Sequence, residues 1–123
     1  MIENVQALQA ISVSQQVAAN NVANVNTNGF RSSRVEYETG PDGEGVRVQG
    51  ITENTQAGPL VPTNETAENG AKFRYEEMFE EGSNTDLATE MVKMIENEQA
   101  FAANAAAIHT DMNMTGVLIN MMV

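Results

Sequence analysis

The sequence predicts a mostly α-helical protein in which two long terminal helices form a coiled-coil-like pair, joined by an insert of one small β-hairpin and loops. Apolar residues recur at helical spacing near both ends of the chain. Between these ends, short alternating apolar runs are interrupted by glycines and prolines, a pattern typical of strands and turns. Valine, leucine, isoleucine and phenylalanine make up about a fifth of the 123 residues, which favours thin helix-on-helix packing over a thick core. We therefore expect three regions: residues 1–29, 30–82 and 83–123.

The first region predicts a helix over about residues 2–25. Its apolar stripe follows heptad spacing, with Gln15 completing it, and consists of Leu8, Ile11, Ala18, Val22 and Val25. The Asn-rich run 26–29 marks the end of the helix, because Asn and Gly tolerate left-handed backbone. Further asparagines inside the stretch are poor helix formers, so this helix would be marginal on its own.

The middle region predicts a β-hairpin and loops. Apolar residues alternate from Val35 to Thr39 and again from Val46, and a Gly-rich turn at 40–45 separates the two runs. Residues 57–70 contain Gly58, Pro59 and Pro62 and are expected to be loop. A third short strand is expected at 72–75.

The third region predicts a long helix beginning at Ser83, where Ser83 and Asp86 have the spacing of a capping box. One column of its stripe repeats every seven residues: Leu87, Met94, Phe101, Ile108, Thr115 and Met122. A second column lies four residues later: Met91, Glu98, Ala105, Met112 and Ile119. Such a helix would be roughly 55–60 Å long, far longer than a 13.3 kDa globule. It must therefore pack on something long, either the first helix or other subunits.

Two polar residues interrupt the predicted stripes, Gln15 in the first helix and Glu98 in the second. A polar residue in an apolar seam costs stability and tends to fix register or partner number. The alternative is that the seam is exposed to solvent at these points.

Composition argues against several functional classes. A net charge of −11 repels phosphate backbones, so we expect no nucleic-acid partner. With no Cys and one His, neither thiol chemistry nor a His-rich or thiolate metal site is expected, and no cofactor. We interpret His109 as a solvent-edge helix residue and the loop 42–45 as a plain turn. The paired carboxylates have no accompanying nucleophile or oxyanion hole, so we expect no enzyme. No apolar run is long enough to predict a transmembrane segment.

Two segments resemble signatures of bacterial flagellar axial proteins, the rod, hook and hook-associated proteins. The run AlaAsnAsnValAlaAsnValAsnThrAsnGlyPhe at 19–30 resembles their N-terminal signature A-N-N-I-A-N-x-N-T-P-G-Y/F, and the run 83–95, followed by 99–105, resembles the C-terminal one. The residues that carry the match are Ala19, Asn20, Asn21, Asn24, Asn26, Thr27, Gly29, Ser83, Asn84 and Asp86. The chain departs from the signatures at Asn28, where Pro is usual, and at Gln99, Phe101 and Ala102.

The resemblance implies a structural subunit of the flagellar basal-body rod that self-assembles through its terminal helices. Only about 55 residues separate the two signatures, too few for a large β domain, so the chain is most similar to the short proximal-rod proteins. The implied partners are other rod subunits and the flagellar type III export apparatus. The N-terminus lacks the basic and apolar segments of a cleavable signal, which agrees with this export route to the basal body.

The residues expected at the assembly interface are those of the apolar stripes. They are Leu8, Ile11, Ala18, Val22, Val25, Leu87, Met91, Met94, Phe101, Ala105, Ile108, Met112 and Ile119. Two alternatives stay open at this point. One is a distal-rod or hook-like paralogue, and the other is a helical adaptor or export regulator of the flagellar system that shares only the heptads.

Overall fold

A computed structural model describes residues 1–62 and 79–122. Two helices contain most of the described residues: α1 spans Ile2–Ala23 and α2 spans Leu87–Met122. Between them lie strands β1 (Ser33–Thr39) and β2 (Val46–Glu53), joined by the short 3-10 turn Pro41–Gly43, and strands β3 (Leu60–Pro62) and β4 (Phe79–Glu81). The prediction of two terminal helices with a β-hairpin insert is confirmed.

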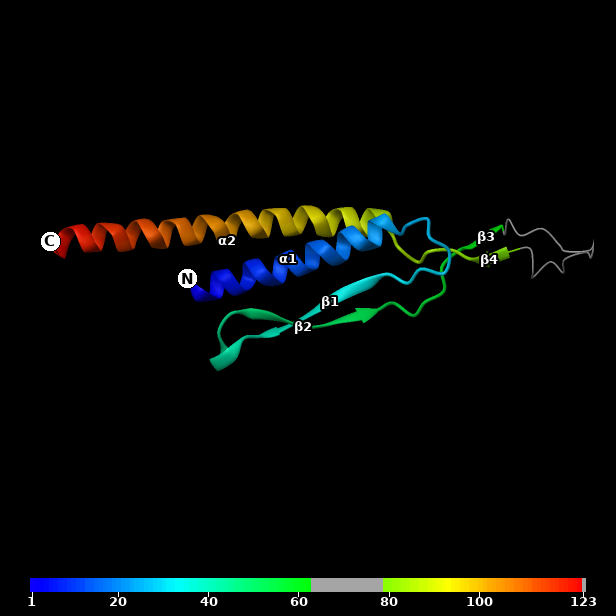
Figure 1. Cartoon of the computed structure of the whole chain (residues 1–123), viewed down its shortest axis with the longest axis horizontal. Coiled ribbons are helices and arrows are strands. Elements are labelled where there is room, and N and C mark those ends of the chain that lie inside the picture. Colours follow the sequence, from blue (N-terminus) through cyan, green and yellow to red (C-terminus); the bar gives the residue numbers. More distant parts are fainter. Residues whose placement is uncertain (63–78, 123) are drawn as a thin grey trace, which may run out of the picture.

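The two helices run in opposite directions, with α1 lying between α2 and the β1–β2 hairpin (Figure 1). The N-terminal ammonium of Met1 lies 3.6 Å from the carboxylate of Asp111, whereas Ser14, further along α1, meets Asn97, nearer the start of α2. Both chain ends therefore point toward the same end of the molecule. Because α2 is 36 residues long and α1 is 22, α2 continues beyond its contact with α1.

The hairpin forms where the sequence alternates. β1 and β2 pair antiparallel from Ser33 opposite Glu53 to Thr39 opposite Val46, with one register irregularity between Glu36 and Tyr37. At the turn, Asp42 has a φ of 62° and is followed by two glycines that also have positive φ. Asp is among the few non-glycine residues that tolerate this region, which explains why the turn forms at this point in the sequence.

A second ladder joins β3 and β4 and was not predicted. Leu60 pairs with Glu81 and Pro62 pairs with Phe79, so the expectation of continuous loop over residues 57–70 is wrong at β3. A strand of three residues has no periodicity of its own and depends on a partner that is distant in sequence. The third strand expected at 72–75 lies outside the described residues.

The start of α2 also differs from the prediction. The helix begins at Leu87, and Asp86 occupies the N-cap position: its Oδ1 accepts from the backbone N–H of Ala88 at 3.1 Å and of Thr89 at 3.4 Å. The hydroxyl of Ser83 instead accepts from the N–H of Thr85 at 3.2 Å, in a local turn before the helix. Ser83 and Asp86 therefore do not form a capping box, because the cap is the aspartate itself.

The interior is thin, as the composition predicts. Among the described residues, the fully buried apolar side chains are two alanines of α1, Ala10 and Ala18. The largest completely buried side chain is polar, that of Asn21. Small residues let elements approach closely but bury little apolar area, so hydrogen bonds must hold much of this fold together.

Candidate assembly interface and polar junction

The predicted apolar stripe of the first helix is at least half-buried. Ala18 is buried and the other predicted members, Leu8, Ile11, Val22 and Val25, are all half-buried. A groove of about 510 Å³ runs between the helices on one side and is lined by Ile11 and Ala19 of α1 and Phe101 of α2. Of the predicted stripe, Ile11 therefore lies beside α2.

The face that α2 turns toward α1 differs from the predicted one by a single position. Its first column agrees, since Met94 and Ile108 are half-buried and Phe101 is 44% exposed beside the groove. The other column, however, is polar and recurs every seven residues: Glu90, Asn97, Asn104 and Asp111. Each of these residues directly precedes a member of the predicted apolar column. The apolar members of that predicted column are exposed: Met91 at 54%, Met112 at 58%, Ile119 at 57%, and Ala105.

Asn97 forms side-chain hydrogen bonds that join α2 to α1. Its Nδ2 donates to the hydroxyl of Ser14 at 3.1 Å and to the amide oxygen of Gln15 at 3.2 Å. Gln15 thus meets a polar partner across the helix pair, but that partner is Asn97; Glu98 is exposed. Sequence reasoning missed Asn97 because it followed apolar residues, although the seven-residue recurrence of polar ones was visible.

The exposed apolar surface of α2 is extensive in this chain. Beyond Asp111, the segment 112–122 has no charged side chain, and its large apolar side chains are 57–87% exposed. Leu87, at the start of the helix, is also 43% exposed. We call residues 112–122 the free end of α2. A helix that is apolar around much of its circumference is normally buried by another element.

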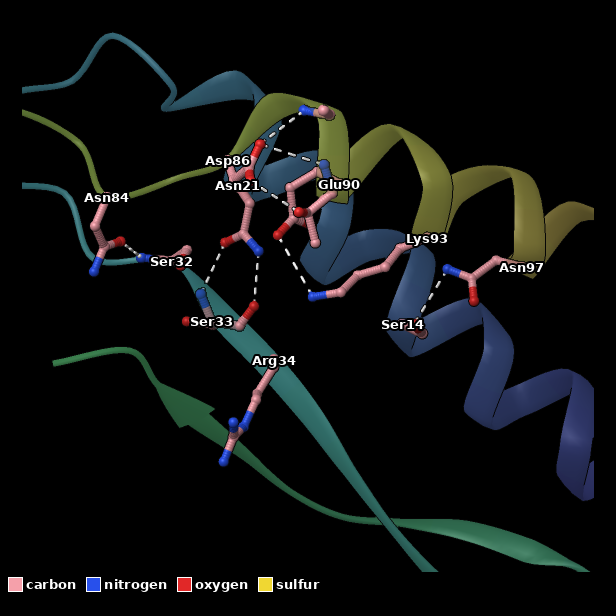
Figure 2. A network of polar contacts seen from close by, with 12 residues as sticks. Ser14, Asn21, Ser32, Ser33, Arg34, Asn84, Asp86, Glu90, Lys93 and Asn97 are labelled. Atoms are coloured by element: carbon pink, nitrogen blue, oxygen red, sulfur yellow. Dashed lines mark hydrogen bonds and ion pairs between the residues drawn. The ribbon is translucent and has the colours of Figure 1, made fainter. Parts of the chain in front are cut away.

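A cluster of polar residues, which we call the polar junction, holds the end of α1, the start of β1 and the start of α2 together (Figure 2). Asn21 is completely buried: its Nδ2 donates to the carbonyl of Ser33 at 2.7 Å, and its Oδ1 accepts from the N–H of Ser33 at 2.9 Å. Asn84 lies on the other side, where its Oδ1 accepts from the N–H of Ser32 at 2.6 Å. Its Nδ2 donates to the carbonyls of Asn54 and Gln56 at 2.9 and 2.8 Å.

The other motif residues shape the turn that follows α1. Asn24 donates to the carbonyl of Asn20 at 2.9 Å and accepts from the hydroxyl of Thr27 at 3.0 Å. Gly29 has a φ of +74°, and its N–H donates to the carbonyl of Glu81 at 2.7 Å. Asn28, which replaces the usual proline, donates to the carboxylate of Glu80. Ala19, Asn20 and Asn26 are exposed.

Glu90 is the buried charged residue of the polar junction. It is 4% exposed, and its Oε1 lies 3.6 Å from the ammonium of Lys93. Within the described residues its Oε2 has no hydrogen-bond partner, and the same is true of the hydroxyl of Thr85. Grooves of about 300 and 500 Å³ adjoin it, and Arg34 and Lys93 line both. Asp86 is exposed, and the hydroxyl and N–H of Thr89 hold the pKa of its carboxyl below the usual range.

The geometry of the described residues offers assembly surfaces and structural hydrogen bonds. In residues 1–62 and 79–122, no group of three or more His, Asp or Glu is placed to hold a metal ion. Neither helix of this part of the chain is long and apolar enough to cross a membrane.

Comparison with known families agrees with this arrangement. Residues 4–31 match the family described as Flagella basal body rod protein, and residues 77–121 match the Flagellar basal body rod FlgEFG protein C-terminal family. The chain belongs to the flagellar basal-body rod proteins. The two matches together cover more than half of it and include almost all of α1, both asparagines of the polar junction, Asn21 and Asn84, and almost all of α2. No individual curated protein was found to match the chain. The family is structural and belongs to the flagellum, which supports a role in the rod and in motility.

Proposed function

We propose that the protein is a self-assembling subunit of the flagellar basal-body rod, of the short proximal-rod type, that joins neighbouring subunits through its terminal helices. The observation that carries this proposal is the exposed apolar surface of α2, the column of Met91, Ala105, Met112 and Ile119 together with the free end. These side chains are exposed in the single chain, and a helical polymer would bury them.

The distribution of charge also supports the exposed surface of α2 as the contact between subunits. With a net charge of −11, two copies repel one another over most of their surface. The free end of α2 has no charged side chain. Contact through this segment would avoid bringing like charges together, and burial of each large apolar side chain would contribute roughly 1.5–3 kcal/mol.

The partners that we propose are further copies of the chain, other rod subunits and the flagellar type III export apparatus, which would deliver the subunit to the basal body without cleavage of a signal. The family matches support a structural role. The second candidate is a distal-rod or hook-like paralogue, because the C-terminal family is named for FlgEFG proteins. The shortness of the region between α1 and α2 favours the proximal type.

The test introduces one charge into the exposed surface. Met91→Asp and Ile119→Asp should leave the folded monomer unchanged, because both side chains are more than half exposed, and should abolish sedimentable polymers and motility. Gln49→Asp, which adds the same charge to an exposed position of β2, is the matched control and should assemble normally. Secreted protein is quantified in parallel to separate export from assembly. Normal assembly of both α2 variants would reject this surface, and export without any polymer in the unmodified chain would favour an adaptor or regulator.

A further inference from the structure

The first residues of β1 are held from two sides by side-chain amides that belong to different segments. Asn21 comes from α1 and binds Ser33, whereas Asn84 precedes α2 and binds Ser32. The hairpin is thereby attached to both terminal helices at neighbouring backbone positions, as Figure 2 shows.

The bonds of Asn21 reproduce those of a neighbouring strand. In an antiparallel ladder, one residue donates to and accepts from the backbone of the residue opposite it. The carboxamide of Asn21 does both toward Ser33, at 2.7 and 2.9 Å. Since Asn21 is fully buried, water does not compete for these bonds.

Asn84 forms hydrogen bonds on the other side of the polar junction. It accepts from the N–H of Ser32, just before β1, and donates to the carbonyls of Asn54 and Gln56, just after β2. One side chain thus ties the entry of the hairpin to its exit. The hairpin also meets α1 through apolar residues, with Ala10 and Val13 facing Pro41 and Val48 around a groove of about 380 Å³.

We propose that Asn21 and Asn84 are positioning residues that fix the direction in which the hairpin leaves the helix pair. The amide of Asn21 supplies the hydrogen bonds of an absent third strand and that of Asn84 joins the two ends of the hairpin, so these two side chains set its direction beyond what apolar contact with α1 provides. The consequence for assembly rests on the proposed function: in a helical polymer every subunit must present its hairpin in the same direction.

The first test is Asn21→Asp, measured by amide hydrogen exchange on the free, full-length chain. The carboxylate cannot donate to the carbonyl of Ser33, and the buried acceptor is left unpaired. Exchange in β1 and β2 should become faster by at least about tenfold, while α2 keeps its protection. Asn20→Asp is the matched control, because it makes the same chemical change at the neighbouring, exposed residue and should leave the hairpin unaltered.

Acid provides a rescue that a general packing role would not give. A protonated carboxylic acid has one donor and one acceptor and can restore both bonds to Ser33. Burial favours this neutral form, so in the variant the folded-state pKa lies above the ordinary Asp value of about 3.9. Hairpin protection in Asn21→Asp should therefore be low at neutral pH and recover as the pH falls through that raised value, whereas Asn20→Asp shows no such recovery.

Asn84→Asp is the second variant and removes the donor to Asn54 and Gln56. It should also loosen the hairpin while α1 and α2 remain paired. Equal loss of protection in the hairpin and the helices, or no recovery of Asn21→Asp in acid, would overturn the proposal. A variant with a loosened hairpin that still forms normal polymers would overturn the role in assembly, while leaving the proposed rod function intact, because the exchange measurement uses the unassembled chain.

Discussion

The polar junction and the free end of α2 contain opposite kinds of residue and differ just as much in exposure. At the junction, the completely buried side chain is the amide of Asn21. At the free end, the apolar side chains of Ile119 and Met122 are 57% and 87% exposed. In most globular domains the apolar groups are inside and the amides outside. The reversal indicates that hydrogen bonds give the single chain much of its shape, and under the proposed function the exposed apolar area would serve contacts between chains.

The largest effect should come from placing a charge on the part of α2 where contacts within the chain and the proposed contacts between chains meet. Ile108→Asp and Phe101→Asp should abolish polymer formation and motility, because both residues belong to the column of α2 that lies along α1. Ile108 is half-buried, so its substitution should also lower the free energy of unfolding of the monomer, by roughly 1–3 kcal/mol. Chemical denaturation and a basal-body assay check the two effects separately. Ile108→Leu is the control, and assembly by both charged variants would refute the prediction.

Hydrogen exchange should show the next largest contrast. In the unassembled chain, amides of the free end should exchange far faster than those of residues 90–108, because helices without packing partners are only marginally stable in water. In assembled polymer the same amides should become protected. Uniform protection along the whole of α2 in the monomer would show that the free end does not depend on a neighbour.

A smaller effect separates the two asparagines of the polar column of α2. Asn97 bonds to α1, whereas Asn104 donates to the carbonyl of Ala100 in its own helix at 2.8 Å. Asn97→Ala should therefore lower the free energy of unfolding by about 1–2 kcal/mol, and Asn104→Ala by less than about 0.5 kcal/mol. Denaturant midpoints measure both. Equal losses would mean that the bonds to Ser14 and Gln15 do not hold the helices together.

The smallest effect concerns the cap of α2. The pKa of Asp86 is lowered in the folded chain, so its contribution is complete at neutral pH and is lost as the pH falls through that lowered value. Asp86→Asn keeps a capping side chain but cannot titrate, so the loss of thermal stability between pH 7 and pH 2 should be smaller than in the unmodified chain. Asp42→Asn, an exposed change in the hairpin turn, controls for the removal of one charge. An identical acid response in both variants would exclude a role for the cap.

The spacing of apolar residues predicted the helices and strands that are long enough to have a buried face of their own. The stripe from Leu8 to Val25 and the alternation from Val35 to Thr39 were sufficient for α1 and β1, because burial of one face sets the spacing of apolar residues. β3 could not be predicted because its three residues are strand only through their pairing with β4. The contacts between subunits at the stripe residues stay a prediction.

The polar contacts were harder to predict than the elements. Asn21 was interpreted as a poor helix former, and that is correct for an isolated helix; its two bonds to Ser33 depend on tertiary structure. The recurrence of Glu90, Asn97, Asn104 and Asp111 is visible in the sequence. Apolar residues alone select the column one position later, which the structure leaves exposed.

The unequal lengths of α1 and α2 have a mechanical consequence. Met1 lies opposite Asp111, so the two helices of one subunit stop at different heights. This difference exists at one end only, because at the polar junction the end of α1 lies beside the start of α2 (Figure 1). If copies were stacked along a shaft, the free end of α2 would span the length that the shorter α1 leaves open, so a twisting load there would pass through the contacts that the free end makes with its neighbours.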